Sequence, residues 1–579
     1  MKIKKIYIKN FRSIKELSFT FPEKGFLVLV GPNNAGKSNI LRAINALLGD
    51  TWFTTDRLEI YDYYCRNSNN GIEIRIEFDN GYQVCFDMNN KFPKYIDDIG
   101  NTIYGTRGNI KEDFPCTYLD ASRNLSREME FRTWTLMGKI SKSFSKAINK
   151  SKEDLLKEKF NEIMDIFNGV ENFVSFKTDF VRYFDEMQVN SSYQLKVDFK
   201  AFTPSNYFKT INILASDPNL SDKFDIELDE LGEGSRNIVL LALLRSYAKN
   251  FRNDAQGIIA VEEPEIFMHP QARRHLYNIF WEIVESSNMQ IILTTHSSTF
   301  VRTEDFDTIG KVYKVYDENK KLNTKVKLVN KDELVDFCIK TGVPAEKTGD
   351  NIFDFYRTTS NYKLNEGFFA RFLVLVEGET EELALPVYLK QAGVDCDLLG
   401  VSIIAVNGKN QIPKYWRLFY KFDIPMLVLF DNDNSKGKEN SNKNLAKCFS
   451  CSIEDILNDI DIYKIIEVSD CPIEPTFKQK IMILERDFET AIRKDWIRQI
   501  GSDEDINNYE KEAKAFIKPI ENGNKGQIAR FIARKLVNDF AFVPEFVEKI
   551  RDIILSAFKE MENIVEENFE TEEYEELPF

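Results

Sequence analysis

The hydrophobic pattern of the chain alternates between two periods, and together they predict an α/β protein. Apolar and polar residues alternate over 2–11 and 14–21, which is typical of half-buried antiparallel strands. A continuous apolar run, FLVLV (26–30), indicates a fully buried strand, and the helical pattern NILRAINALLG (39–49) follows it. Similar apolar runs recur later in the chain, so we expect parallel sheets covered by helices.

A phosphate-binding loop is predicted between this first buried strand and its helix. The segment GPNNAGKS matches the pattern G-x-x-x-x-G-K-S. Its glycines let backbone N–H groups turn toward phosphates at the helix N-terminus, its lysine places a charge on the outer phosphates, and its serine offers a hydroxyl to Mg²⁺. The expected nucleotide-binding residues here are Gly31, Asn34, Gly36, Lys37, Ser38 and Asn39, with Ser38 also a metal ligand.

Two later apolar runs end in residues that suit nucleotide hydrolysis. GIIAVEEPEIFMHP (257–270) places Glu262 and Glu263 at a strand end. The first carboxylate can hold Mg²⁺, and the second can activate the attacking water as a general base. MQIILTTHSS (289–298) ends near His296, whose imidazole can sense or position the terminal phosphate.

A second anion site is predicted far along the chain from the phosphate-binding loop. LDELGEGSRNIVLLALL (228–244) has Gly234 and Ser235 at the start of a strongly apolar helix, whose N-terminus favours anions. Because a single active site does not need two such sites, we expect this helix to serve the nucleotide of a neighbouring subunit. A homodimer or higher even oligomer follows.

The C-terminal part repeats the strand-and-helix pattern with carboxylates at its strand ends. FLVLV recurs and leads into EGETEELALPVYLKQAG, with Glu377 at the strand end and Glu381 in the first helical turn. Another run leads into DNDNSKGK, with Asp431 and Asp433. Because parallel strand ends share one edge, these four acids should lie within a few ångströms of each other. Crowded carboxylates need cations, and oxygen ligands suit Mg²⁺, Mn²⁺ or Ca²⁺.

Two other metal sites fit the residues less well. An EF-hand starting at Asp431 would need Gly and Glu where Lys436 and Asn442 stand. The segment CFSC (448–451) could begin a zinc site, but Cys471 is the only candidate for a third ligand and no His is near. The eight scattered cysteines are therefore expected to be free thiols in a reducing compartment.

Charge and length limit the classes of function. The net charge of -15 argues against an overall basic surface but allows a local basic channel for nucleic acid. Lysines recur at helical spacing over 139–159, as on a solvated helix face, and residues 562–576 form an acidic, solvated end. No run approaches the roughly 18 apolar residues of a membrane span, so we expect a cytoplasmic protein that does not enter a membrane.

The order of these motifs resembles that of the ABC-type ATPases of DNA repair and chromosome maintenance. The N-terminal segment IKNFRSIKELSF is similar to their opening. In that family two ATPase heads sandwich ATP and the signature helix acts in trans, so the resemblance implies a dimer. Glu262 stands where the broad family has Asp, and LGEGS is a loose form of the signature. Without long heptad-rich arms, a chromosome-cohesion machine is not expected.

The pattern E-G-x-x-E followed by D-x-D resembles the Toprim domain. Joined behind an ABC-type head, it is similar to the overcoming lysogenization defect (OLD) family of ATP-dependent nucleases, to which Gabija-type antiphage nucleases also belong. LVEGETEELALPVY and IAVEEPEIFMHP carry this resemblance. It implies that Glu377 is catalytic and that LERDFETAI adds metal ligands, Glu485 and Asp487, with Glu489 as an alternative. It also implies that Lys525 stabilises charge at the cleaved phosphate; from residues alone, both segments read as solvated helix positions.

We therefore expect an α/β protein with an ABC-type P-loop ATPase head, a helical insert and a Rossmann-like Toprim domain. The expected function is an ATP-regulated DNA endonuclease with a two-metal mechanism, in phage defence or DNA processing, with a helicase as a candidate partner. A non-cleaving DNA repair ATPase or clamp and a strand-passing enzyme with a Tyr nucleophile are the alternatives. The expected parts are an ATPase domain (1–310, with an insert over 124–225 that serves as a dimer contact), a connection (311–365), a nuclease domain (366–545) and a helix with an acidic tail (546–579).

Overall fold

The structure is a computed structural model. It describes residues 1–49, 53–103, 114–120, 135–148, 150–187, 211, 213–216, 225–250, 256–266, 268–317, 320–347, 354–357, 362–432, 439–458, 460–468, 479–500, 503–517 and 525–563.

The N-terminal half begins with an antiparallel sheet whose strands follow in the order β2-β1-β4-β5-β6-β7. The alternating pattern of the first two strands is confirmed, since they pair antiparallel and bury every second side chain over much of their length. Apolar side chains of this sheet pack against helix α1 (Lys37–Leu48). The strands are β1 (Ile3–Phe11), β2 (Ile14–Thr20), β4 (Glu73–Phe78), β5 (Gln83–Asp87), β6 (Lys94–Ile96) and β7 (Thr102–Ile103).

The second sheet of this half has the order β14-β13-β3-β12-β11-β8. All of its strands except β14 run parallel, so their carboxyl ends share one edge. Helix α1 follows β3, and α9 (Pro270–Ser286) connects β11 to β12. Strands β13 and β14 extend this sheet into the segment that the sequence suggested as a connection. The strands are β3 (Phe26–Val30), β8 (Cys116–Leu119), β11 (Gln256–Glu262), β12 (Asn288–Thr294), β13 (Ile309–Tyr316) and β14 (Leu322–Leu328).

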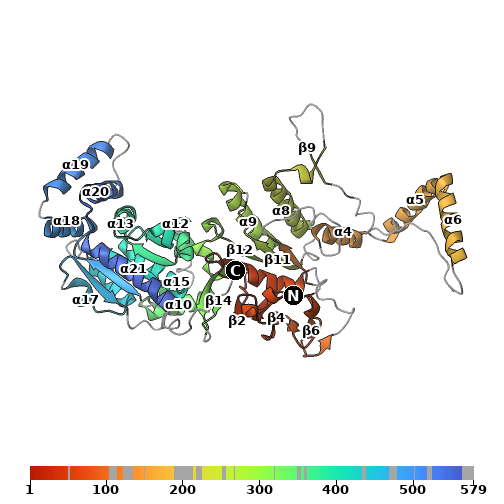
Figure 1. Ribbon diagram of the computed structural model, residues 1–579, viewed down its shortest axis with the longest axis horizontal. Helices are drawn as coiled ribbons and strands as arrows, with labels where there is room; N and C mark the ends of the chain where they lie inside the picture. The colour runs from red at the N-terminus through yellow and green to blue at the C-terminus, as the bar shows by residue number, and fades with distance from the viewer. Residues whose placement is uncertain are drawn as a thin grey trace, which may run out of the picture.

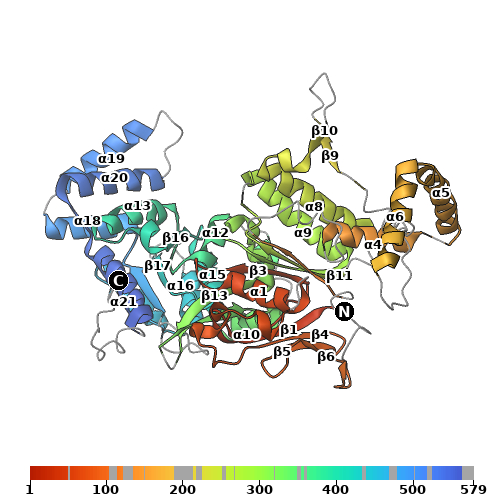
Figure 2. The ribbon, with the colours of Figure 1, turned by 45° about the vertical axis from the view of Figure 1, so that its right-hand side comes forward.

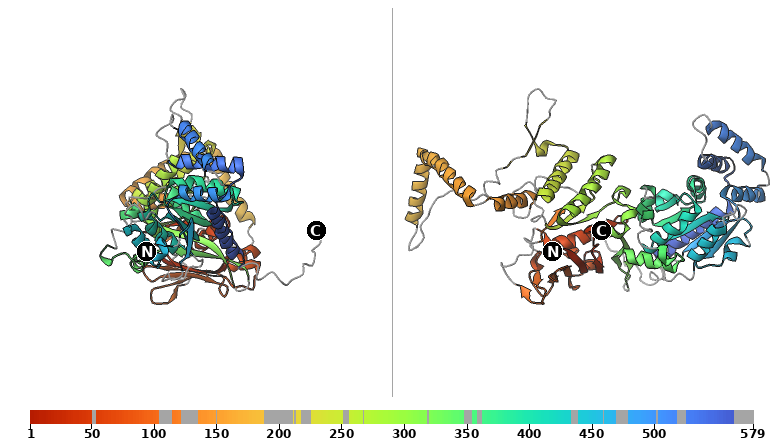
Figure 3. Two further views of the ribbon diagram at one scale, coloured as in Figure 1. Left: turned by 90° about the vertical axis from the view of Figure 1, so that its left-hand side faces the viewer. Right: turned by 180° about the vertical axis from the view of Figure 1, so that it is seen from behind.

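The expected insert is helical over most of its described part. Helices α5 and α6 project away from the rest of the chain (Figures 1 and 3). The lysine-rich segment 139–159 lies on α4 and α5, while residues 121–134 and 188–210 lie outside the described residues. The elements are α4 (Leu136–Ala147), α5 (Lys150–Asn168), α6 (Glu171–Met187), the antiparallel strands β9 (Leu214–Ser216) and β10 (Asp225–Glu227), and α8 (Glu233–Asn250).

The C-terminal half is a sheet of order β16-β15-β17-β19-β18 between helical layers. Its strands are β15 (Phe372–Val376), β16 (Val401–Ala405), β17 (Met426–Asp431), β18 (Tyr463–Glu467) and β19 (Lys480–Leu484), and only β18 is antiparallel. Apolar side chains of α13, α18, α20 and α21 share one core, and those of α15 and α16 belong to another. The helices are α13 (Glu379–Gln391), α14 (Cys396–Leu399), α15 (Ile412–Lys421), α16 (Glu439–Cys448), α17 (Ile453–Leu457), α18 (Phe488–Gln499), α19 (Glu504–Ile517), α20 (Lys525–Phe540) and α21 (Glu545–Asn563).

One continuous core joins the two halves. A single cluster of buried apolar side chains runs from Phe300 and Phe306 through Phe337 on α10 (Lys331–Lys340) to Phe419 on α15. Figure 2 shows α12 (Tyr362–Glu366) near the junction of the halves. The expected α/β fold class is confirmed. Within the described residues, no helix is long and apolar enough to cross a membrane.

Candidate functional site

The phosphate-binding loop is shaped by close packing on the β13–β14 hairpin. A Cβ atom at Gly31 would lie 2.1 Å from the carbonyl oxygen of Val312, and one at Gly36 would lie 2.3 Å from Thr324 Oγ1. Both glycines also have positive φ angles, of 149° and 106°, which other residues rarely adopt. Glycine is therefore required at both predicted positions.

Polar contacts hold this loop from behind. Thr324 Oγ1 donates to the carbonyl of Ala35 at 2.9 Å, and Asn39 Nδ2 donates to Ser13 Oγ at 2.8 Å. Asn39 thus contacts the N-terminal sheet, while Asn34 adopts a left-handed conformation within the loop, with a φ of 61°. Ser38 is the second residue of α1.

Lys37 is buried behind the loop. Its Nζ donates to the carbonyl oxygens of Gly31 and Pro32 at 2.9 and 3.0 Å. Burial lowers the pKa of Lys37 to about 8, and Glu263 and Glu265 oppose that shift. A desolvated ammonium gains from an incoming anion, so the site suits a polyphosphate.

The two predicted acids at the end of β11 have different surroundings. Glu262 is buried and accepts a hydrogen bond from Tyr118 Oη at 2.7 Å. Glu263 is half-exposed and has a φ of 44°, a strained conformation that is often kept at functional sites. Its carboxylate lies 3.8 Å from His296 Nε2. Burial and Lys37 lower the pKa of His296, which favours a neutral imidazole there.

Glu265 is a site residue that the sequence analysis missed. Its Oε1 accepts hydrogen bonds from Thr295 Oγ1 at 2.8 Å and from the backbone N–H of His296 at 2.7 Å. It therefore fixes the turn that carries His296. The motif VEEPE contains this third acid, but only the fold shows that it faces the end of β12.

The predicted signature residues lie apart from the phosphate-binding loop. Gly234 and Ser235 fall in the first turn of α8, and Ser235 is exposed. Helix α8 packs on α4 and α9, and it is separated from α1 in Figure 2. The structure thus brings together the other predicted nucleotide-site elements but not these two residues.

A second edge, in the C-terminal half, collects carboxylates. Glu377 follows β15, and Glu381 lies in the first turn of α13, where its Oε2 accepts the N–H of Gly378 at 3.2 Å. Burial raises the pKa of Glu381 to about 7, with Glu377 and Glu489 adding to the shift. Asp431 ends the neighbouring parallel strand β17.

Asp431 lies at the centre of this acidic edge. Burial raises the pKa of its carboxyl well above the ordinary value, and the charges of Glu381, Glu377, Asp487 and Glu489 raise it further. Among the described residues, Asp431 Oδ1 is buried and accepts no hydrogen bond. A cation is the species that such a group lacks.

The third acidic segment reaches the same edge because β19 runs parallel to β17. Asp487 caps α18 by accepting the N–H of Thr490 at 2.8 Å, and Glu489 lies in the first turn of that helix. Glu485 instead forms an ion pair with Lys494 at 2.8 Å. The charges of Asp487 and Glu489 thus raise the pKa of Asp431, whereas the described partner of Glu485 is Lys494.

Helix α20 brings Lys525 to this region. A Cβ atom at Gly526 would lie 2.9 Å from the carbonyl oxygen of Glu379, so the start of α20 rests closely on the first turn of α13. Lys525 and Glu489 both line a cavity of about 290 Å³ between α18, α19 and α20. The predicted lysine therefore lines the same cavity as one of the candidate acids, Glu489.

Lys409 is a second residue that the sequence analysis missed. It is buried, and its Nζ donates to the backbone carbonyls of Asp431 and, at 3.1 Å, Asn432. The preceding Gly408 donates its N–H to the carbonyl of Glu377 at 2.9 Å. The turn after β16 therefore holds the backbone at both carboxylate-bearing strand ends. The two partners of Lys409 lie 22 and 23 residues away along the chain, so the local sequence pattern does not show this contact.

These residues fit a divalent cation in the chemistry of their donors. The carboxylates are hard oxygen ligands, and the buried oxygen of Asp431 suits a metal. Within the described part of the chain, no three His, Cys, Asp or Glu side chains form a ready-made metal group. Asp433, one of the four predicted ligands, lies outside the described residues. Of the suggested zinc ligands, Cys448 is buried and Cys451 is partly buried, and Cys471 also lies outside the described residues.

Replacing Lys409 should weaken metal binding. Lys409→Met removes a buried ammonium that fixes the backbone of Asp431, and loss of such a supporting contact lowers metal affinity by about 10- to 100-fold. The measurement is the Mn²⁺ concentration that gives half of the maximal rise in melting temperature. The exposed Lys390 on α13 gives a matched control, Lys390→Met, that should bind Mn²⁺ like the unaltered chain. Equal Mn²⁺ affinities for both variants would contradict the assigned role of Lys409.

Known protein families match both halves. Residues 1–104 and 83–301 match the family described as "AAA ATPase domain", and residues 368–433 match the family described as "Overcoming lysogenization defect protein-like, TOPRIM domain". The first match extends over more than half of the chain.

Three curated proteins are similar over long stretches. The chain is 24% identical to "OLD nuclease" of Thermus scotoductus over 74% of this chain and 82% of that protein. It is 23% identical to "Old nuclease" of Escherichia phage P2 over 75% of this chain and 77% of that protein. It is 25% identical to "Endonuclease GajA" of Bacillus cereus over 51% of this chain and 44% of that protein. With both domain families matched in this order, the chain belongs to the overcoming lysogenization defect (OLD) family, in which an AAA ATPase domain is joined to a TOPRIM domain.

Proposed function

We propose that this chain is an ATP-regulated, divalent-metal-dependent DNA endonuclease. The main support for the proposal is the buried carboxyl of Asp431 at one sheet edge. Its pKa is raised by burial and by the charges of four acids, Glu381, Glu377, Asp487 and Glu489. The names of the related nucleases and the family's TOPRIM domain support the same activity. DNA as substrate follows from this. Phage defence and a helicase partner rest on family resemblance alone, and a cytoplasmic location rests on the apolar and cysteine patterns of the sequence.

The acidic edge would hold the metals that the cleavage needs. We assign Glu377, Glu381, Asp431 and Asp433 as ligands, with Asp487 and Glu489 facing the same edge and Glu485 retained as a candidate. Bound Mg²⁺ or Mn²⁺ would supply an activated water and shield charge on the reacting phosphodiester, as two-metal nuclease sites do. Glu377 orients the attacking water, and Lys525 binds the phosphate that is cut.

The N-terminal site would bind and hydrolyse ATP. Lys37 and the loop N–H groups bind the phosphates, Ser38 and Glu262 hold Mg²⁺, and Glu263 orients the attacking water. The neutral imidazole of His296 lies beside Glu263 and reads the terminal phosphate. Because one core joins this site to the nuclease half, ATP has a physical route by which to regulate cleavage.

The chain would act as a homodimer. Gly234 and Ser235 lie apart from the phosphate-binding loop, which suits a role at a partner's nucleotide. The projecting helices α5 and α6 also expose apolar side chains, including Phe176 at 60% and Phe180 at 47%, whose rings stack 5.9 Å apart. Exposed aromatic side chains on a projecting helix pair favour a protein contact.

The first test of the nuclease site is Asp431→Asn. This change removes one ligand charge without altering size, so Mg²⁺- or Mn²⁺-dependent nicking of supercoiled plasmid should fall by at least about 100-fold, as expected for lost metal chemistry. ATP hydrolysis should stay near the original rate. The exposed Asp461 supplies a control, Asp461→Asn, that should nick normally. Undiminished nicking by Asp431→Asn would refute the metal-site assignment, and a chain that never nicks would favour the non-cleaving clamp.

The second test separates ATP binding from hydrolysis. Glu263→Gln keeps Lys37 and the metal ligand Glu262, so ATP should still bind while its hydrolysis slows by about 100-fold or more, the scale of a general-base contribution. Glu282→Gln on the exposed face of α9 is the control and should hydrolyse ATP normally. A normal ATPase rate for Glu263→Gln would show that another group activates the water.

A third test addresses the shared nucleotide site. Lys37→Ala and Ser235→Arg should each abolish ATP hydrolysis alone, because each spoils every composite site of its own homodimer. Mixed dimers retain one intact site, so mixing the two variants should restore part of the ATPase rate. If subunit exchange is demonstrated and no activity returns, the two residues do not act across a dimer.

A further inference from the structure

A short helix, α12 (Tyr362–Glu366), contacts both the loop that leaves the nucleotide site and the first turn of the carboxylate helix α13. It lies just before β15 in the chain, and β15 ends at Glu377. The contacts on its two sides differ in kind. Neither of the side chains that make them belongs to the catalytic or binding sets assigned above.

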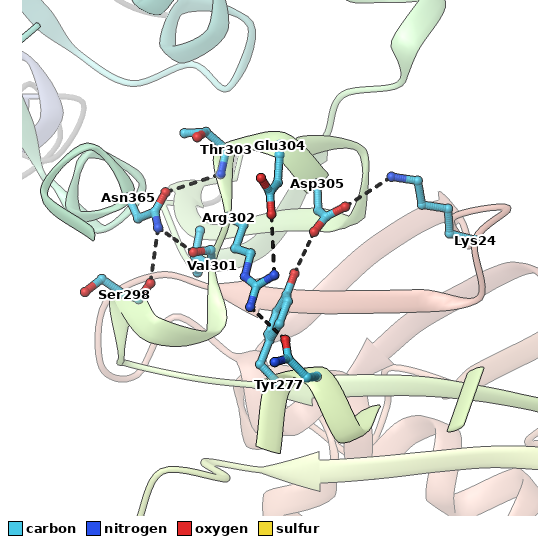
Figure 4. A network of polar contacts seen from close by, with 10 residues as sticks. Lys24, Tyr277, Ser298, Val301, Arg302, Thr303, Glu304, Asp305 and Asn365 are labelled. Carbon is cyan, nitrogen blue, oxygen red and sulfur yellow. Dashed lines mark hydrogen bonds and ion pairs between the residues drawn. The ribbon is translucent and has the colours of Figure 1, made fainter. Parts of the chain in front are cut away.

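The first contact is a buried amide clasp made by Asn365. Its Nδ2 donates to the carbonyl of Val301 at 2.6 Å and to that of Ser298 at 3.5 Å, while its Oδ1 accepts the N–H of Thr303 at 3.2 Å. Asn365 is 2% exposed. Figure 4 shows all three bonds reaching the loop from the α12 side. One side chain therefore satisfies three backbone groups of this loop.

The loop held by Asn365 starts at the nucleotide site. His296 and Thr295, which bind Glu265, directly precede it, and the N–H of Ser297 donates to Thr295 Oγ1 at 2.9 Å. Only Ser297 separates His296 from the first residue that Asn365 contacts. A displacement of His296 would therefore pass directly to the residues that Asn365 contacts.

The far end of the same loop is fixed to the ATPase core. Arg302 stacks over the ring of Tyr277 at 4.2 Å and donates to Asn278 Oδ1 at 2.9 Å. Asp305 accepts hydrogen bonds from Tyr277 Oη and Lys24, as Figure 4 shows. Because these contacts anchor residues 302–305, a shift of the loop that starts at His296 would be taken up at the residues bonded to Asn365.

The second contact of α12 is an ion pair at the nuclease edge. Lys363 pairs with Glu382, whose carboxylate is buried and also accepts the N–H of Ala405 at 3.1 Å. Glu382 is adjacent to Glu381 in the first turn of α13. Lys363 therefore holds the helical turn that presents a proposed metal ligand.

We propose that α12 transmits the nucleotide state of the ATPase site to the nuclease site, with Asn365 and Lys363 as positioning residues. This inference rests on the proposed function and names the regulation of that same site. Asn365 moves with the loop after His296. Lys363 fixes the position of the first turn of α13, which carries Glu381. Neither residue contacts nucleotide or the reacting phosphate.

The test compares nicking of supercoiled plasmid by the full chain with and without a non-hydrolysable ATP analogue, in the presence of Mn²⁺. The response is the ratio of the two rates. In Lys363→Met and Asn365→Ala this ratio should be closer to one than in the original chain. The expected change in the ratio is about 2- to 30-fold, the range of typical mutations that alter coupling. The rate of each variant without nucleotide is its own reference, so a change in metal binding alone leaves the ratio unchanged. ATP hydrolysis should stay within about threefold of the original chain, because the ATPase site keeps its own residues.

Two further variants separate coupling from loss of structure. Lys363→Arg keeps the charge and should retain the response. Lys390→Met removes an exposed lysine of α13 whose ion pair, with Asp395, does not involve α12, so its response should be unchanged. The side chain of Lys363 is 63% exposed, so Lys363→Met should fold even if Asn365→Ala does not, and melting temperatures will show which variants are folded.

The outcomes distinguish the two proposals. If the original chain does not nick DNA with Mn²⁺, the proposed function fails. If it nicks but does not respond to the analogue, or if Lys363→Met responds as strongly as the original chain, the role of α12 is wrong while the nuclease assignment stands. An equal loss of response in Lys390→Met would likewise overturn the specific role of the α12 contacts.

Discussion

Buried carboxylates repel each other at the carboxyl end of the C-terminal sheet, and surrounding contacts must hold them together. Asp431 and Glu381 have raised pKa values because they are buried and because acids surround them. Such groups stay together only if other parts of the fold hold the strand ends in place. The buried Lys409, the N–H of Gly408 and the close approach of Gly526 to α13 do so. The cost of crowding is removed when a cation binds.

The N-terminal half uses the same arrangement of parallel strand ends to bind an anion instead of a cation. Its parallel strands also end in acids, but the buried Lys37 and the glycine loop make that edge a phosphate site. The two edges are then joined by packing, since one apolar core passes from Phe306 to Phe419. Two polar contacts lie along this junction. Asn365 bonds to the loop after β12, and Lys363 pairs with Glu382 of α13. The proposed coupling between ATP use and phosphodiester cleavage would act through this junction.

Much of the fold could be predicted because continuous apolar runs mark buried parallel strands. Strands β3 and β15 have the expected boundaries, and the acids that follow β11, β15 and β17 lie at strand ends as expected. The strand β19 was not expected, because KIMIL is short and the acids after it read as helix positions. Its parallel pairing with β17 is what brings Asp487 and Glu489 close enough to raise the pKa of Asp431.

Residues that act through tertiary contacts could not be predicted in the same way. Glu265, Lys409 and Asn365 are ordinary polar residues in the sequence, and each gains its role from backbone groups that are distant along the chain, by 22 residues for Lys409 and Asp431. Local patterns carry no information about such partners. The placement of Gly234 and Ser235 away from the phosphate-binding loop was expected in principle, but only the fold shows the separation.

The carboxylates of the C-terminal sheet edge are proposed to bind the catalytic cations. The most direct measurement is anomalous X-ray scattering from crystals of the full chain grown with Mn²⁺, compared with crystals grown with a chelator. Mn²⁺ peaks should lie within coordination distance, about 2.0–2.6 Å, of carboxylate oxygens of Asp431 and of Glu377 or Glu381. Full Mn²⁺ occupancy at the phosphate-binding loop with no peak at this edge would contradict this proposal.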